Sequence, residues 1–265
     1  MKPIIEIQNI SKKYRLGMIG NNSLRELLNT CSKNVREKGV LEFLKSLGTD
    51  EDPKKILWAL KDVSFTVDPG EIVGLIGRNG CGKSTLLKIL SRITFPTEGR
   101  AVIRGRSSAL LEVGTGFHAE LSGRENIFLN GAILGMRRRE IEKKLDAIVH
   151  FSEVEKFIDT PIKHYSSGMY VRLAFSVAAH LDQPVLFVDE VLAVGDAKFQ
   201  AKCIEKMRSV ADSGRTIIFV SHDEKAIRTL CGRCVYLRNG KVVASGATPE
   251  MLSLYNAEKP LESAA

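Results

Sequence analysis

The chain has 265 residues, of which 44% are hydrophobic and 26% charged, a balance typical of a globular protein with a sizeable core. Its 39 basic and 31 acidic side chains give a net charge of +8, which permits nucleic acid, an anionic membrane surface or an acidic partner and does not choose among them. We expect no signal peptide, because Met1 leads straight into the alternating pattern Ile4-Glu6-Ile7, and no membrane-spanning segment, because no run of about 18 apolar residues occurs. The scattered cysteines favour a reducing compartment. They are Cys31, Cys81, Cys203, Cys231 and Cys234.

Apolar periodicity places the expected elements along the chain. Strands are predicted at 4–10, 58–67, 72–76, 101–103, 185–188 and 216–220, with turns at 11–15, 68–70 and 97–99. Helical spacing predicts a helix at 84–93, a mostly helical block at 121–181 and an amphipathic stretch at 16–55. Asn239-Gly240 predicts a hairpin turn within 237–242. Strands that alternate with helices favour a mainly parallel sheet covered on both faces, into which the helical block is inserted.

The segment Gly77–Ser84 has the spacing Gly-x4-Gly-Lys-Ser between a buried apolar run and a predicted helix. Its glycines let backbone N–H groups converge on phosphates, and the positive end of the helix adds to the attraction. Lys83 is expected to reach the β and γ phosphates and the Ser84 hydroxyl to hold Mg²⁺. The alternative, a glycine-rich turn with a chance lysine, is disfavoured by this context. ATP contacts are therefore predicted from Gly77, Arg78, Asn79, Gly80, Cys81, Gly82, Lys83, Ser84 and Thr85.

An acidic pair closes a second buried apolar run. Asp189 stands at the carboxyl end of the strand predicted at 185–188, where it is expected beside the phosphate loop and can hold Mg²⁺. Glu190 follows and can accept a proton from an attacking water. The alternative is a capping pair at a strand-to-helix turn. Together the two motifs predict a P-loop nucleotide hydrolase that uses ATP and Mg²⁺.

A third motif indicates the family. Tyr165–Met169 precedes the Asp189 strand and resembles the signature of ATP-binding-cassette proteins, usually Leu-Ser-Gly-Gly-Gln. Ser166 and Gly168 keep the pattern, whereas Tyr165, Ser167 and Met169 replace Leu, the first Gly and Gln. Ser166 also fits a plain helix N-cap. The resemblance implies that Ser166, Ser167 and Gly168 present hydrogen-bond donors to the nucleotide.

Other positions extend the resemblance. His222 follows the strand predicted at 216–220, where the family places a catalytic histidine against the γ-phosphate, and Gly195-Asp196 lies where a dimer-contacting loop is found. Tyr14 stands where the family keeps an aromatic residue that stacks on adenine. The family's usual Mg²⁺-binding glutamine is missing from the segment 110–118, and Glu112, the polar residue nearest to its place, could contact the metal through its carboxylate.

Two segments indicate a branch of the family. The residues 111–118 and 189–196 look like those of ATPases that export lipid-linked polysaccharides such as O-antigen, capsule and teichoic acid. The amphipathic stretch 16–55 fits the O-antigen branch, where it would rest on an anionic membrane surface or a partner. Packing of this stretch onto the cassette core is the alternative.

The resemblance implies a complete architecture and a set of partners. We expect an α/β P-loop NTPase with the cassette arrangement: a mainly parallel core sheet, an antiparallel β subdomain and a helical subdomain at about 119–182. One nucleotide-binding domain would span 1–258, followed by a tail at 259–265. A homodimer is expected on the cytoplasmic face of a bacterial inner membrane, with a membrane-spanning permease that carries the glycan and with no nucleic acid. A soluble cassette ATPase of DNA repair or translation, or a P-loop kinase or GTPase, is the alternative.

The pair Cys231 and Cys234 has the spacing of a redox or zinc motif. No second pair of Cys or His residues lies nearby to complete four ligands. We therefore interpret both thiols as packing groups.

Overall fold

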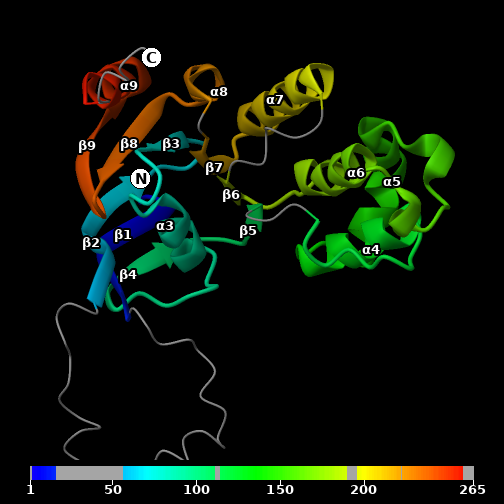
Figure 1. The fold of residues 1–265 in the computed structure, drawn as a ribbon, viewed down its shortest axis with the longest axis horizontal. Helices are drawn as coiled ribbons and strands as arrows, with labels where there is room; N and C mark the ends of the chain where they lie inside the picture. The colour runs from blue at the N-terminus through cyan, green and yellow to red at the C-terminus, as the bar shows by residue number, and fades with distance from the viewer. Residues whose placement is uncertain (1, 16–55, 111–113, 190–195, 222, 259–265) are drawn as a thin grey trace, which may run out of the picture.

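The computed structural model describes residues 2–15, 56–110, 114–189, 196–221 and 223–258. The predicted amphipathic stretch 16–55, the tail 259–265, Glu112, Glu190, Gly195 and His222 lie outside these residues. Two sheets form the larger part of the molecule (Figure 1). The smaller sheet is antiparallel, with strands in the order β2 (Ile56–Val67), β1 (Ile5–Arg15) and β4 (Glu98–Ile103).

The larger sheet has six strands in the order β5-β6-β7-β3-β8-β9. They are β5 (Ser107–Leu110), β6 (Val185–Asp189), β7 (Thr216–Val220), β3 (Ile72–Ile76), β8 (Arg233–Arg238) and β9 (Lys241–Ala247). Every pairing is parallel except that of β8 with β9. At that hairpin Asn239 has φ 49° and Gly240 has φ 75°, as the Asn-Gly prediction requires.

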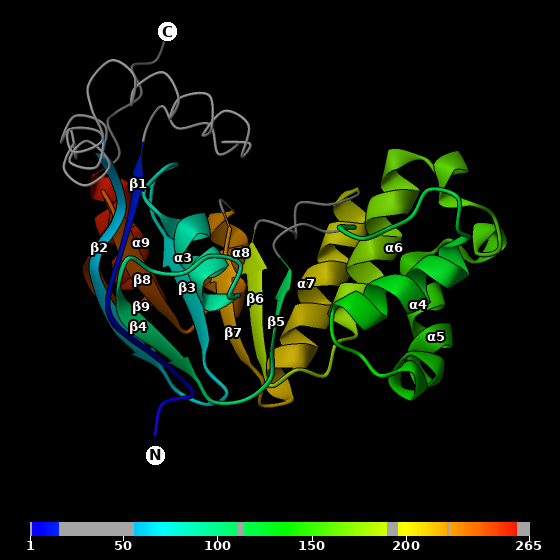
Figure 2. The ribbon, with the colours of Figure 1, turned by 90° about the horizontal axis from the view of Figure 1, so that it is seen from below.

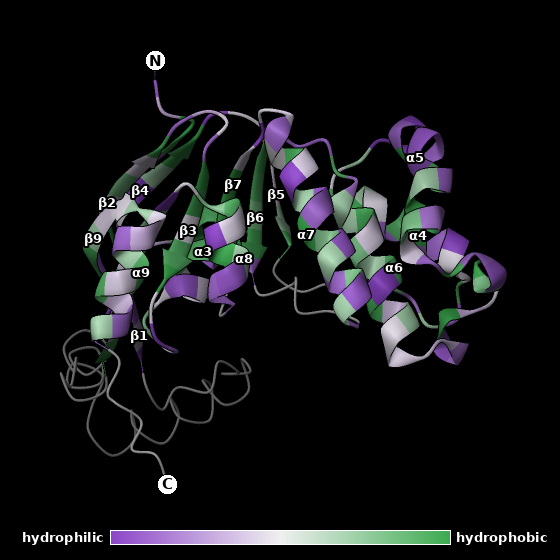
Figure 3. Ribbon diagram, turned by 90° about the horizontal axis from the view of Figure 1, so that it is seen from above, coloured by the Kyte–Doolittle hydropathy of each residue, from purple (hydrophilic) through white to green (hydrophobic). Residues whose placement is uncertain are grey.

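Helices cover both faces of the larger sheet, which explains why its strands are apolar throughout. All five residues of β7 are buried, and they alternate between two cores. Ile218 and Val220 face the core that α3 (Lys83–Leu90) and the antiparallel sheet share. Ile217 and Phe219 face the core beneath α7 (Ala197–Asp212), α8 (Glu224–Leu230) and α9 (Thr248–Ala257). Figure 3 shows the hydrophobic strands enclosed between helices whose outer faces are polar.

The predicted helical block lies at one end of the molecule, beyond the β5 edge of the sheet (Figures 1 and 2). It comprises α4 (Gly123–Ile133), α5 (Arg138–Ser152) and α6 (Ser167–Ala179), with single 3-10 turns at Glu155–Phe157 and Ile162–His164. Ser122 and Glu125 form a reciprocal capping box at the start of α4. Within the described ranges every helix is too short or too polar for a bilayer span.

Three sequence predictions are corrected by the structure. Residues 11–15 form no turn but continue β1, because Lys12 to Arg15 pair with Leu60 to Ile56 of β2. The turn predicted at 97–99 ends earlier, since β4 begins at Glu98, and the helix predicted at 84–93 runs from Lys83 to Leu90. Strand β5 was not predicted, because its four residues carry no periodic pattern and it pairs with a strand far along the chain.

Both cysteines of the Cys231/Cys234 pair are buried and free, in agreement with a packing role. A Cβ on Gly74 of β3 would lie 2.8 Å from the Cys234 Sγ and 3.2 Å from the Cys231 Sγ, so both thiols fill space against that strand. Burial raises the pKa of both thiols, which keeps them protonated.

Candidate nucleotide site

The phosphate loop joins the buried strand β3 to α3, and its glycines are required by its shape. Gly77 has φ 149°, and a Cβ there would lie 2.2 Å from the Leu237 carbonyl oxygen. Gly82 has φ 110°, and its Cβ would lie 2.6 Å from the Ala59 carbonyl oxygen. Side chains at these positions would therefore displace backbone of β8 and β2. The glycines of the phosphate loop are therefore needed where the loop packs closely against neighbouring strands, as well as where a ligand would approach it.

Lys83 is the first residue of α3, and its side chain lies within the loop with only 7% of the residue exposed. Its Nζ donates to the carbonyl oxygens of Gly77 at 2.6 Å and Arg78 at 3.1 Å. These bonds compensate for the burial of the ammonium group and hold it at the helix start, where unpaired N–H groups also gather. The arrangement concentrates positive charge, as binding of an anionic ligand demands.

A cavity of about 610 Å³ lies over this loop. Its lining brings together eight residues predicted from sequence: Tyr14, Asn79, Gly80, Gly82, Lys83, Ser84, Thr85 and Asp189. Gly77 is buried beneath the loop, whereas Arg78 and Cys81 line a neighbouring cavity of about 290 Å³ with Tyr236 and Arg238. The first cavity therefore has the size of a small-molecule site and combines a phosphate loop with an acidic side chain.

The sequence interpretation missed part of the lining. Leu57 and Trp58 of β2 border the cavity together with Val220, Asn239 and Gly240. Leu57 is 50% exposed and Trp58 38% exposed, which is unusual for large apolar side chains at the end of a strand. Trp58 is the only tryptophan of the chain, but its place beside the cavity follows from the pairing of β2 with β1, where it lies opposite Lys13, and local sequence carried no signal for it.

Ser84 and Asp189 could hold a magnesium ion, because both line the same cavity. Ser84 lies in the first turn of α3, and Asp189 ends β6 beside Val220 of β7. A hydroxyl and a carboxylate oxygen are both of the kind that binds Mg²⁺ in proteins. Two of the predicted metal ligands are thus brought together, whereas Glu112 lies outside the described residues.

The signature-like residues lie elsewhere. Ser166 caps α6, its hydroxyl accepting a bond from the Met169 N–H at 3.2 Å, and Ser166 and Ser167 are exposed. Neither they nor Gly168 line the cavity of the phosphate loop. The start of α6 is thus open to solvent. Its hydrogen-bond donors could therefore reach a ligand that is bound outside this chain's own cavity. One chain does not unite the two halves of the predicted site.

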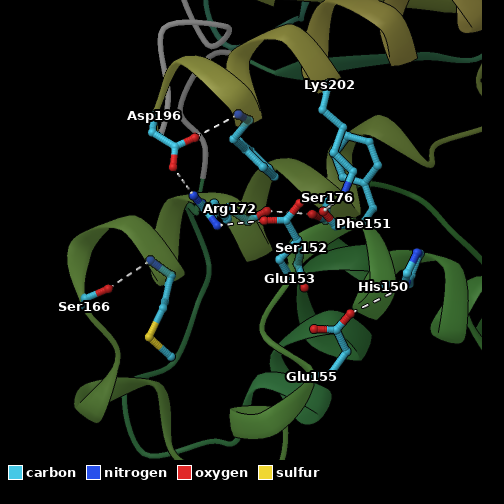
Figure 4. Close-up of polar contacts among 12 residues, drawn as sticks. His150, Phe151, Ser152, Glu153, Glu155, Ser166, Arg172, Ser176, Asp196 and Lys202 are labelled. Atoms are coloured by element: carbon cyan, nitrogen blue, oxygen red, sulfur yellow. Dashed lines mark hydrogen bonds and ion pairs between the residues drawn. The ribbon is translucent and has the colours of Figure 1, made fainter.

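Arg172, one turn further along α6, connects three segments (Figure 4). Its guanidinium bonds Glu153 at 3.0 Å and Asp196 at 2.7 Å, and it lies 5.1 Å from the centroid of the Phe199 ring. Asp196 also caps α7 by accepting from the Phe199 N–H at 2.9 Å. That backbone bond, with the nearby Arg172 charge, lowers the pKa of Asp196. Arg172 lies three residues after the signature-like segment Tyr165–Met169, and its partners could not be inferred from sequence because they are distant along the chain.

Comparison with known proteins decides the family. The sequence pattern of the ABC transporter family matches residues 60–193. The chain is 42% identical to the O-antigen export system ATP-binding protein RfbB of Klebsiella pneumoniae, over 96% of this chain and 98% of that protein. The chain belongs to the ABC transporter family. The resemblance carried by Tyr165–Met169 and the phosphate loop is thereby confirmed.

One further sequence relative and one solved structure are also similar to this chain. The Teichoic acids export ATP-binding protein TagH of Bacillus cereus is 35% identical over 97% of this chain and 43% of its own length. A solved dimeric ATP-binding cassette in a post-hydrolysis state, bound to ADP and phosphate, superposes with a TM-score of 0.68. It is 21% identical and covers 92% of this chain and 98% of its own, so it confirms the cassette fold.

Proposed function

We propose that this chain is the ATP-hydrolysing subunit of an ABC transporter that exports a lipid-linked polysaccharide, with O-antigen as the leading candidate. The observation that carries this proposal is 42% identity to an O-antigen export ATP-binding protein across nearly the full length of both chains. The cavity supports it, because it joins a phosphate loop to an acidic strand end. The soluble cassette ATPase is not favoured by any of these relatives.

Different residues of the cavity bind different parts of ATP. Lys83 and the N-terminal turn of α3 bind phosphates, while Tyr14 offers its ring to the base. Ser84 and Asp189 would hold Mg²⁺, which would neutralise charge on the phosphates. Glu190 accepts the proton of the attacking water, and His222 contacts the γ-phosphate. These two roles rest on the family resemblance of the sequence.

A second copy of the chain completes the site. Ser166 and Ser167 are exposed and lie outside the cavity that Lys83 lines, so their donors are free for ATP held by another chain. Two copies arranged head to tail would each supply one such helix start to the other. ATP then closes the dimer, and its hydrolysis reopens it.

The permease partner requires a docking surface, and a groove of about 600 Å³ supplies one. It lies between the sheet and the helical block and is lined by residues of β5, α4 and α6. Ile93 and Ile133 border it with 63% and 57% of their surface exposed. An apolar groove of this kind fits a helix of a membrane protein. We propose that a chain docked in this way lies at the cytoplasmic face of the inner membrane.

The decisive experiment is reconstitution with a membrane-spanning permease that co-purifies with this chain. The complex should hydrolyse ATP and move lipid-linked glycan into vesicles, and Glu190→Gln should bind ATP, form a stable dimer and transport nothing. Hydrolysis at the wild-type rate by Glu190→Gln would show that the base is misassigned. Binding to nucleic acid with a steep salt dependence, and none to the permease, would instead favour the soluble class.

A further inference from the structure

The start of α6 is fastened to the segment that follows β5. The Tyr170 hydroxyl donates to the Gly114 carbonyl oxygen over 2.9 Å, and the Tyr170 ring stands edge-on to Phe117 with centroids 5.2 Å apart. Gly114 has φ 88°, and a Cβ there would lie 2.5 Å from the Tyr170 Cε1. The Tyr170 ring therefore packs directly against the backbone of Gly114. Tyr170 itself lies two residues after Gly168.

Helix α4 holds the same segment from another direction. Asn130, which is 3% exposed, donates from Nδ2 to the Thr115 carbonyl oxygen at 2.8 Å. The fully buried Asn126 accepts from the His118 N–H at 2.7 Å and donates to the His118 carbonyl oxygen at 3.1 Å. Buried amides with satisfied bonds define one backbone position. These bonds thus fix the segment 114–118 to the helical block.

This segment also forms a wall of the groove. Gly114 and Thr115 line it together with Ala174 and Ala178, which lie on α6 one and two turns beyond Tyr170. An occupant of the groove would therefore contact Gly114, which accepts the Tyr170 bond, and helix α6, which carries Tyr170. The Tyr170–Gly114 contact thus lies between the groove proposed to bind the permease and the start of α6, which is proposed to contact ATP.

We propose that Tyr170 is a positioning residue, whose bond to Gly114 holds the start of α6 in the orientation that brings Ser166–Gly168 to the ATP of a second chain. The inference rests on the proposed function, because it requires the shared ATP site. Tyr170 itself touches no part of the cavity around Lys83. Its removal should therefore weaken ATP-driven assembly and leave binding of ATP by a single chain unchanged.

The test uses the full chain with Glu190→Gln, so that the ATP-bound dimer accumulates. Sedimentation velocity gives the dimer fraction as ATP is titrated. Adding Tyr170→Phe, which removes only the hydroxyl, should raise the ATP concentration for half-assembly about two- to tenfold, the range that one hydrogen bond supports. The affinity for a fluorescent ATP analogue, measured at protein concentrations too low for dimers, should stay the same.

Ser176→Ala is the matched control. It removes another hydroxyl-to-carbonyl bond of α6, from Ser176 to Arg172 at 2.6 Å, that does not reach the groove wall. It should leave assembly unchanged. Gly114→Ala should shift assembly in the same direction as Tyr170→Phe, and the two changes together should shift it by less than their sum, because they disrupt one contact.

The possible failures are distinct. Assembly by Glu190→Gln that is insensitive to Tyr170→Phe, or equally sensitive to Ser176→Ala, would overturn the role of Tyr170 and leave the proposed function standing. No ATP-driven assembly by Glu190→Gln would overturn the shared site and, with it, this inference.

Discussion

Protonation of His180 should weaken the fold in mildly acidic solution. His180 ends α6, and its Nδ1 lies 2.7 Å from the Ser176 carbonyl oxygen. Burial lowers the pKa of His180 to about 4, and the charges of Lys206 and Lys144 add to this effect. The Ser176 carbonyl and Asp182 act in the opposite direction and do not compensate for it. The native imidazole is therefore neutral at neutral pH.

The sign of the effect follows from proton counting. The ordinary pKa is 6.5 and the folded value about 4, so the unfolded chain binds more protons than the native state between these values. The contribution to stability is complete above about pH 6.5 and is lost as the pH falls towards about 4. At about pH 5 the calculated loss is about 2 kcal/mol. This is an upper value, because the ring is only partly buried and solvent screens its charge.

Urea unfolding at about pH 7.5 and about pH 5 measures this loss. Other groups titrate over the same interval, so the comparison is between the wild-type chain and His180→Asn, which keeps an amide donor near the Ser176 carbonyl. The wild type should lose more of its free energy of unfolding than the variant, by up to about 2 kcal/mol. Equal losses in both proteins would refute the assignment of this pH dependence to His180.

Two further predictions concern the nucleotide site. Gly77→Ala should lower the free energy of unfolding by about 2 kcal/mol or more, because its Cβ would meet the Leu237 backbone. The control is Gly214→Ala, because Gly214 has φ 80° and open space around it. This change should lower the free energy of unfolding only by the left-handed backbone strain of about 1–2 kcal/mol. Equal melting temperatures for the two variants would contradict the explanation. Tyr14→Ala should weaken the binding free energy of ATP by about 1–3 kcal/mol, because its ring stacks on the base in the proposed site. Calorimetry with inorganic triphosphate, which lacks a base, is the control, and an equal loss there would exclude stacking.

The phosphate loop was predictable because its chemistry is contiguous. Gly77, Gly82 and Lys83 are close in sequence, and the buried run of β3 before them and the helix after them are strong local signals. Asp189 was predictable for the same reason, since four buried residues precede it and place it at the carboxyl end of a buried strand. Fold class followed from the alternation of such strands with helices.

The missed features depend on distant partners. Residues 11–15 carry three basic side chains and were interpreted as a turn, yet β2 pairs with them across the long stretch that separates the two strands. Trp58 borders the cavity only because that pairing brings the end of β2 beside the phosphate loop. Tyr170 has an ordinary helical pattern, and only the folded chain brings its hydroxyl to Gly114. Such contacts are set by tertiary packing rather than by local sequence.

Helix α6 is held by segments that leave two adjacent strands. Leu110 ends β5 and pairs with Val188, next to the last residue of β6. Tyr170 reaches the segment after β5, and Arg172 reaches Asp196, beyond β6. The two contacts therefore tie the first turns of α6 to the segments that follow β5 and β6.

Neither contact should control α6 alone. The Asp196 side chain is 61% exposed, so its ion pair with Arg172 is worth about 0–1 kcal/mol. The neutral Tyr170 bond is worth about 0.5–1.5 kcal/mol. Because these values overlap, loss of one contact leaves the other to hold the helix. For this reason Tyr170→Phe is expected to shift ATP-driven assembly by a measurable factor and not to abolish it.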